Sequence, residues 1–319
     1  EGDCVHNYVP VPGALSKKET YYYKYTNENG QVRFGEAYYC DGKHTARRWL
    51  KHSAGWFTTS SGSLNHKPTR DSLAGQTMYV KSKTPRTSRL DAAKTAAQNF
   101  LKTYSGLKFN TDGTVATGQE SKDLDRYVSV VTFAKSVTLQ QGWIDVSNPT
   151  GYNTVKNLLA GESLKADGGT NLDAGLCYAE YLLKQNAVKD ATKNVIALSD
   201  GEPTFYLSDS YYCDDYCGGD GTSVTIGNQT YYVHGRGSSC NNTTKTSTDS
   251  AAADVKKVPA DLYTICFGGA TEMMKKPDNG NWGFTVGKYM EDLASEKDGK
   301  KLAYTASNAN ELNAAFAAI

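Results

Sequence analysis

Two polar positions in this 319-residue chain carry side chains that could hold a metal ion or a polar ligand. Asp200 comes just after the apolar run Val195–Leu198, and Thr170 follows two glycines and precedes a helix-like stretch that starts at Leu172. A carboxylate and a hydroxyl are hard oxygen ligands of the kind that Mg²⁺ and Ca²⁺ bind. The pair therefore predicts a polar site, provided that the fold brings the two residues together.

The segments around these residues alternate between strand-like and helix-like patterns. We expect strands at 77–80, 127–134, 194–199, 262–267 and 302–305, and helices at 90–104, 154–159, 172–184, 289–294 and 309–319. This alternation predicts an α/β fold, a doubly wound and mostly parallel sheet covered by helices on both faces. Ligands of such sheets bind beyond the carboxyl ends of the strands, which is where Asp200 and Thr170 are expected.

Two regions depart from the alternation. Residues 1–75 hold strand-like runs and the turn signal Asn27–Gly30, and they predict a small β-rich extension with Cys4 and Cys40 as its plausible disulfide. The stretch from about 205 to 250 has no helical period, but its cysteines and short strand-like runs favour an ordered arm. The predicted domains are the extension at 1–75 and an α/β domain at 76–319 that carries this inserted arm.

Composition excludes several classes of protein. The formal net charge of +1 gives no reason to expect nucleic acid as a partner, and no run of 18 apolar residues could span a membrane. The chain opens without an apolar stretch, so we expect that a signal peptide was removed or that it begins inside a longer protein. No Ser/His/Asp set or carboxylate pair falls on strand ends, and no phosphate-binding glycine motif occurs, so we do not expect an enzyme.

Seven cysteines in a polar chain rich in Tyr and Thr indicate an oxidising compartment, and their odd number leaves at least one thiol unpaired. We expect Cys177 and Cys266 either to be buried thiols or to pair with each other. A second group of cysteines could bind zinc instead of forming disulfides, with His234 as the one obvious fourth ligand. This group consists of Cys213, Cys217 and Cys240. The five histidines are otherwise expected at the surface.

Four segments together resemble the von Willebrand factor A family, in the version carried by sortase-assembled pilus tip adhesins of Gram-positive bacteria. The resemblance extends over residues 76–319, and the arm and the stretch that starts at Trp56 are also similar to features of these adhesins. The segments that carry it are Ser88–Ala97, Gly168–Leu176, Val195–Thr204 and Ala306–Phe316.

The resemblance implies a metal-ion-dependent adhesion site built by three loops. Thr170 matches the ligand of the second loop and Asp200 that of the third. The first loop of the family reads Asp-x-Ser-x-Ser, and counting back from the helix places Ser82 and Thr84 at its two hydroxyls, with Val80 in place of the aspartate. The implied ligands of Mg²⁺ or Ca²⁺ are therefore Ser82, Thr84, Thr170 and Asp200, in a degenerate site.

The replaced aspartate leaves alternatives open. Losing a carboxylate weakens the attraction for a cation, and Lys81 or Lys83 could pair with Asp200 instead. A second alignment puts the first loop at Thr59–Leu64, with Thr59 in place of the aspartate. In a simpler interpretation, Asp200 does no more than form a turn after its strand. Thr170 then does no more than cap its helix, and Asp173 completes a capping box. Asp167 and Glu202 are expected to lie around the site or in solvent.

The resemblance implies a cell-surface adhesin module that binds an extracellular host protein, a glycan or the matrix through the top of the domain and the arm. It places the protein outside the cell, on a bacterial surface, cell wall or pilus, with other pilus subunits as further partners. The alternative is a structural stalk or scaffold domain whose metal site has decayed. A chelatase subunit is a third reading, which the cysteines and the arm disfavour.

Overall fold

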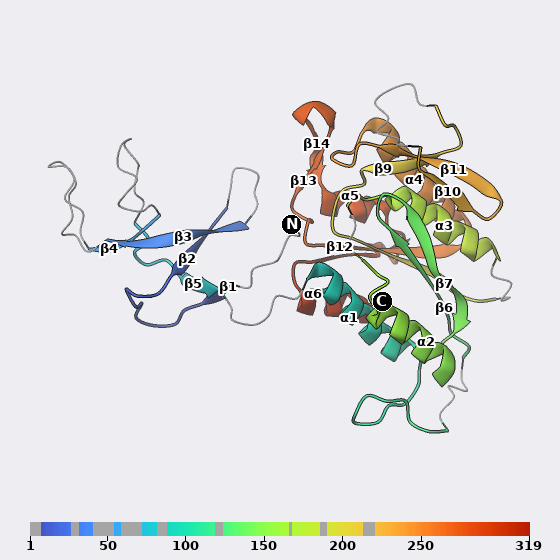
Figure 1. Ribbon diagram of the computed structural model, residues 1–319, viewed down its shortest axis with the longest axis horizontal. Helices are drawn as coiled ribbons and strands as arrows, with labels where there is room; N and C mark the ends of the chain where they lie inside the picture. Colours follow the sequence, from blue (N-terminus) through green and yellow to red (C-terminus); the bar gives the residue numbers. More distant parts are fainter. Residues whose placement is uncertain are drawn as a thin grey trace. The chain divides into compact units, whose positions relative to one another are not determined.

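The computed structural model describes residues 8–26, 32–40, 54–58, 72–81, 88–118, 124–165, 168–185, 190–212 and 221–319. The chain divides between Ser88 and Arg89 into two compact units, each of which has its own hydrophobic core. We describe each unit by itself (Figure 1).

The N-terminal unit is a five-stranded antiparallel sheet with the strand order β1-β5-β2-β3-β4. Tyr21 in β2 pairs with Ala37 in β3, and both are buried in a small core that also includes Leu73 and Met78. The strands are β1 (Tyr8–Pro10), β2 (Tyr21–Thr26), β3 (Val32–Cys40), β4 (Gly55–Phe57) and β5 (Met78–Lys81). The β-rich character predicted for this region is therefore present.

The strand predicted at 77–80 forms, but it belongs to this sheet and not to the α/β unit. Tyr79 in β5 pairs with Tyr22 in β2, and Val80 pairs with Val9 in β1. Likewise Trp56 lies in β4 and pairs with Tyr39, so it does not lead into the α/β unit. The first helix of the α/β unit consequently begins at the unit boundary, at Arg89.

The second unit is the predicted α/β fold. A parallel sheet has the order β17-β12-β8, and β6 pairs with β7 antiparallel. Its strands are β6 (Tyr127–Phe133), β7 (Val137–Asp145), β8 (Lys193–Ser199), β12 (Ala260–Phe267) and β17 (Ala303–Ala306). Its helices are α1 (Arg89–Tyr104), α2 (Pro149–Ala160), α3 (Leu172–Gln185), α4 (Asn242–Lys257), α5 (Val286–Leu293) and α6 (Ala309–Ala317).

Helices cover both faces of the strands. One cluster packs α3, α4 and α5 against β8 and β12 around Leu262, Met290 and Leu176, and a second packs α1 and α6 on the other face around Ile265 and Leu312. A third cluster joins α1 and α2 to β6 and β7. The two groups of helices lie on opposite sides of β12 in Figure 1. The doubly wound architecture predicted from the alternation is thus confirmed.

The predicted arm is ordered where the structure describes it. It forms an antiparallel sheet with the order β10-β11-β9, and this sheet packs on α3 through Val224, Ile226 and Val233. Its strands are β9 (Phe205–Ser208), β10 (Ser223–Ile226) and β11 (Gln229–Gly235). The predicted end of the arm at 250 is wrong, because α4 already begins at Asn242, where the Asn241 side chain accepts a hydrogen bond from Thr244 N.

Smaller elements complete the described chain: β13 (Met273–Lys275), the 3₁₀ helix η1 (Pro277–Asn279), β14 (Asn281–Thr285), β15 (Glu296–Lys297) and β16 (Lys300–Lys301). The pairs β13–β14 and β15–β16 form hairpins. Within the described ranges, none of the helices is both long and apolar enough to pass through a bilayer.

Replacing Leu262 with alanine tests the core of the α/β unit. This side chain is fully buried in β12, so Leu262→Ala should lower the free energy of unfolding by about 3 kcal/mol through lost burial and a new cavity. A urea titration followed by circular dichroism at the helix band reports on this unit, which contains all the helices of the described residues. Leu139→Ala is the control; its half-exposed side chain should change the free energy by under about 1 kcal/mol.

Candidate functional site

The fold brings Thr170 and Asp200 together at the carboxyl edge of the strands. Asp200 directly follows β8, and Thr170 lies in the loop before α3. The two loops are so close that a Cβ added to Gly201 would lie 3.7 Å from the Thr170 Oγ1. The Asp200 side chain is 59 % exposed, so its carboxylate faces solvent.

Backbone hydrogen bonds fix the Thr170 loop. Thr170 O accepts hydrogen bonds from Thr204 N at 2.8 Å and from Phe205 N at 3.2 Å, while Thr170 N donates to Thr204 Oγ1 at 3.0 Å. The residue that caps α3 is Asn171, whose Oδ1 accepts a hydrogen bond from Ala174 N at 3.0 Å. Thr170 is therefore not the helix cap that the simpler reading expected, and its hydroxyl is not used for capping.

Among the described residues, the basic residue that pairs with Asp200 is an arginine, Arg89. Arg89 Nη1, on the first residue of α1, donates to Asp200 Oδ2 at 3.4 Å. Gly268 makes room for this guanidinium, because a Cβ there would lie 2.8 Å from Arg89 Cζ and its φ of +93° favours glycine. Lys81 instead lies over the ring of Tyr22 in the N-terminal unit. The one feature of the sequence that could have indicated this ion pair is the glycine pair after the strand predicted at 262–267.

The remaining predicted ligands, Ser82 and Thr84, lie outside the described residues, as do Thr59, Lys83 and Asp167. Val80 is described and lies in β5 of the N-terminal unit, where it pairs with Val9. Glu202 turns to β13, where its carboxylate accepts a hydrogen bond from Lys275 N, and burial raises its pKa.

The donors Thr170 and Asp200 fit a hard divalent cation in their chemistry, since both offer oxygen atoms at the edge of the sheet. The guanidinium of Arg89 opposes such a cation, because it places a fixed positive charge against the same carboxylate. No cluster of three or more His, Cys, Asp or Glu side chains that could hold a metal occurs in the described part of the chain.

Asp173, the residue expected to complete a capping box with Thr170, has a different structural role. Asp173 is buried in α3, and its Oδ2 accepts a hydrogen bond from Leu207 N in β9 at 2.7 Å. Burial raises the pKa of Asp173 to about 6, and the hydrogen bond from Leu207 opposes the shift. Asp173 therefore anchors the first strand of the arm and does not cap the helix.

The cysteines whose side chains are described are free thiols: Cys177, Cys240 and Cys266. Burial raises the pKa of each, which makes these thiols unreactive. His234 is buried, contrary to the expectation of a surface residue, and its Nε2 lies 2.9 Å from Ser210 O. The partners proposed for Cys4, Cys40, Cys213 and Cys217 involve side chains outside the described residues.

An open α/β sheet with polar loops at its carboxyl edge defines a class of ligand-binding domains. Residues 75–202 match the family model of the von Willebrand factor type A domain. The sequence resemblance to the von Willebrand factor A family is therefore confirmed over these residues. No curated protein sequence matches the chain at a significant level.

Two solved structures are similar to this chain in fold. The pilus adhesin SpaC from Lactobacillus rhamnosus GG is 16 % identical with a TM-score of 0.50, over 73 % of this chain and 27 % of the adhesin. A variant of the PilB minor pilin from Streptococcus sanguinis is 17 % identical with a TM-score of 0.50, over 99 % of this chain and 84 % of the pilin. The chain thus spans about a quarter of the length of SpaC.

The buried carboxylate of Asp173 should make the stability of this unit depend on pH. Its pKa is about 6 in the folded protein against 3.8 for the ordinary group, so folding favours the protonated form. The stabilisation is complete below about pH 4 and is lost as the pH rises through 6, with a total of up to about 3 kcal/mol. Asp173→Asn keeps an acceptor for Leu207 N and should flatten the profile.

Urea titrations at intervals between pH 4 and pH 7 measure this effect. At pH 7 Asp173→Asn should be more stable than the wild type, and the difference should shrink towards pH 4. Asp209→Asn, which changes an exposed carboxylate at the end of β9, is the matched control and should follow the wild type. An unchanged pH profile in Asp173→Asn would contradict the assignment.

Proposed function

We propose that this chain is the binding module of an extracellular bacterial adhesin of the pilus type. It binds a host or matrix protein or a glycan through the carboxyl edge of the von Willebrand factor type A domain and through the arm. The observation that carries this proposal is the exposed carboxylate of Asp200 beside the Thr170 hydroxyl, at the edge where open α/β sheets bind ligands.

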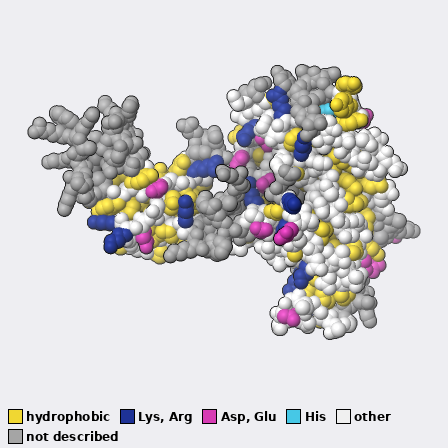
Figure 2. All heavy atoms as spheres, viewed as in Figure 1, with side chains coloured by type: hydrophobic (Ala, Val, Ile, Leu, Met, Phe, Trp, Pro, Cys, Tyr) yellow, Lys and Arg dark blue, Asp and Glu magenta, His cyan; other side chains and the backbone are white. Residues whose placement is uncertain are grey.

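The arm supplies a second contact surface. Tyr211 and Tyr212 follow β9 and are 58 % and 83 % exposed. The ring of Tyr211 packs edge-on against Tyr212 at 5.4 Å and against Tyr232 at 5.3 Å, so two large aromatic faces are presented on an ordered sheet. Figure 2 shows hydrophobic side chains gathered in this outer region of the α/β unit. Rigid exposed tyrosines are favoured at binding surfaces because they bury much area at a low entropic cost.

The solved relatives support an extracellular location on a bacterial surface or pilus, since one is a pilus adhesin and the other a minor pilin. They also favour a binding role over an enzymatic one, with other pilus subunits as further partners. For the metal, Thr170 and Asp200, together with Ser82 and Thr84, are the proposed ligands of Mg²⁺ or Ca²⁺. The charge of Arg89 makes this a weak site.

The alternative function is a stalk or scaffold domain that holds other parts of a pilus in place. The ion pair between Arg89 and Asp200 favours this alternative, because it satisfies the carboxylate internally and leaves less of it for a ligand. The two functions differ in what the carboxyl edge contacts, and binding measurements separate them.

Substituting the arm tyrosines tests the adhesin function. The double variant Tyr211→Ala/Tyr212→Ala should reduce binding to a panel of immobilised matrix proteins and glycans at least tenfold, since exposed aromatic residues dominate binding energies. Tyr25→Ala, which removes a 44 % exposed tyrosine of the N-terminal unit, is the matched control. Absence of binding by the wild type to every member of the panel, with capture of another pilus subunit, would support the stalk function instead.

Removing the competing charge tests the metal site. Arg89→Ala should tighten the binding of Mg²⁺ or Mn²⁺ by about fivefold, which corresponds to about 1 kcal/mol for an exposed ion pair. Isothermal calorimetry at constant ionic strength gives the dissociation constants. Lys108→Ala removes a positive charge beyond the far end of α1 and should leave them unchanged. Calorimetric silence of both Arg89→Ala and the wild type at millimolar metal would exclude a metal site at these residues.

A further inference from the structure

A polar pocket of about 290 Å³ lies between α4 and α5 of the α/β unit. Helix α4 contributes residues from a single face, because their spacings of four, three and four positions bring them into one row along the helix. This row consists of Lys245, Asp249, Ala252 and Lys256. Helix α5 adds Tyr289, Asp292 and Leu293, and β14 adds Phe284. The pocket therefore combines charged groups of both signs with aromatic rings.

The row on α4 is polar at positions where the contact between two helices ordinarily favours apolar side chains. Ala252 and Leu293 are buried and continue into the core of the unit. The charged side chains beside them are only partly buried, with 26 % of Lys245 and 41 % of Asp249 exposed. Burial lowers the pKa of Lys256, so its charge is held there at a cost. Charged groups kept in a pocket against such a cost are typical of functional sites.

Contacts within the protein hold these charged groups in position. Lys245 Nζ donates to Asp249 Oδ2 at 2.6 Å, and Oδ1 of the same carboxylate accepts a hydrogen bond from Tyr289 OH at 2.9 Å. Lys256 Nζ donates to Leu293 O at 2.8 Å. An ammonium group has three N–H donors and a carboxylate has about four lone-pair sites, so these groups can form further hydrogen bonds. The pocket thus presents donors and acceptors whose positions are already set.

The balance of charge in the pocket disfavours a charged ligand. An anion that Lys245 and Lys256 attract would be repelled by the two aspartates, and a cation would be repelled by the two lysines. A zwitterion would have to separate Lys245 from Asp249 to reach both charges. A hydroxyl group can accept a hydrogen bond from an ammonium group and donate one to a carboxylate at the same time, so it binds to the closed pair without separating it. A neutral ligand rich in hydroxyl groups fits this arrangement.

The aromatic rings of the pocket supply an apolar surface for the same ligand. The ring centroids of Phe284 and Tyr289 are 6.3 Å apart, and the ring planes differ by 22°. Tyr289 is buried, but Phe284 is only partly buried, so the ring of Phe284 is the accessible one. The C–H groups on one face of a sugar ring can pack on such a ring, while the hydroxyl groups around the sugar reach the charged side chains.

We propose that the pocket between α4 and α5 binds one unit of a neutral glycan, with a face of the sugar on Phe284 and its hydroxyl groups on Lys245 and Asp249. The volume is at the lower end of the range for ligand pockets, which suits a single sugar unit. Neither Asp200 of the carboxyl edge nor the exposed tyrosines of the arm line this pocket. The glycan site is therefore independent of the surfaces proposed above for adhesion.

Ligand-observed NMR titrations of the 319-residue chain with free sugars test this proposal. The probes are glucose, galactose and mannose, each with its uronic acid and its 2-amino counterpart. At least one neutral sugar should bind, and its negatively and positively charged counterparts should bind at least about threefold more weakly, because each meets two like charges in the pocket. Absence of binding by all three neutral sugars, or tighter binding of a charged counterpart, would overturn the proposal.

Variants of the pocket locate the bound sugar. Asp249→Asn keeps an acceptor for Tyr289 OH but loses the carboxylate, and it should weaken the binding of the neutral sugar at least about tenfold. Phe284→Ala should weaken it by a similar factor through the lost ring contact. Asp254→Asn is the matched control: Asp254 also lies on α4, is 41 % exposed and pairs with a lysine, but it does not line the pocket. This variant should bind the sugar like the wild type.

Circular dichroism confirms that each variant is folded before its binding is measured. Sugar binding that survives in folded Asp249→Asn, or that Asp254→Asn weakens equally, would contradict a site between α4 and α5. The arm variant Tyr211→Ala/Tyr212→Ala should bind the sugar unchanged, even if it no longer binds immobilised matrix proteins. Loss of sugar binding in the arm variant alone would assign the sugar to the arm and would likewise overturn the proposal.

Discussion

The carboxyl edge of the α/β unit depends on the backbone of one short loop, Thr170–Asn171. Asn171 N in this loop donates a hydrogen bond to Ala134 O, just after β6. Thr170 accepts a hydrogen bond from Thr204 N and donates one to Thr204 Oγ1, after the end of β8. A buried loop must satisfy its backbone groups, and here those bonds also set the spacing of the edge. The position of the Thr170 hydroxyl beside Gly201 follows from them.

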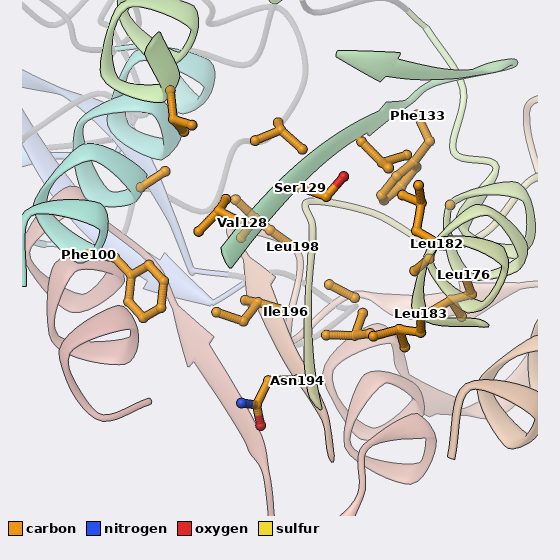
Figure 3. Close-up of a pocket in the computed structure, with 18 of the residues that line it drawn as sticks. Phe100, Val128, Ser129, Phe133, Leu176, Leu182, Leu183, Asn194, Ile196 and Leu198 are labelled. Carbon is orange, nitrogen blue, oxygen red and sulfur yellow. The ribbon is translucent and has the colours of Figure 1, made fainter. Parts of the chain in front are cut away.

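An apolar pocket of about 300 Å³ lies between β6 and β8 of the α/β unit, and α1 and α3 also line it (Figure 3). The residues of β6 beside this pocket are only half-buried, although the strand is mainly apolar. Elsewhere in the unit, the buried carboxylate of Asp173 anchors β9 by accepting a hydrogen bond from Leu207 N.

Elements with strong local patterns could be predicted from the sequence. The spacing of Leu90, Ala97 and Leu101 gives α1, and the apolar run Val195–Leu198 gives β8, both within one or two residues of the structure. β7 was not predicted, because the half-polar Val137–Asp145 becomes a strand through its pairing with β6.

Features that depend on long-range pairing could not be predicted. The pattern at 77–80 indicates a strand but not its partner, and β1 and β2 decide that β5 joins the N-terminal sheet. The sequence pattern predicted that Thr170 and Asp200 lie at one edge of the sheet, but it did not predict that Arg89 pairs with Asp200. That ion pair joins residues 111 positions apart, and only the fold brings them together.

Among the described residues, β6 and β8 each have one edge without a neighbouring strand, and this has a consequence for the self-association of the chain. Each edge presents backbone donors and acceptors next to apolar side chains, which is a template for joining strands of neighbouring molecules. β6 contains no lysine or proline, and β8 has a single lysine at its first residue, Lys193, so these edges carry little of the charge that keeps natural edge strands apart. Self-association of the isolated chain is therefore expected to begin in the middle of its sheet and not at its outer strands.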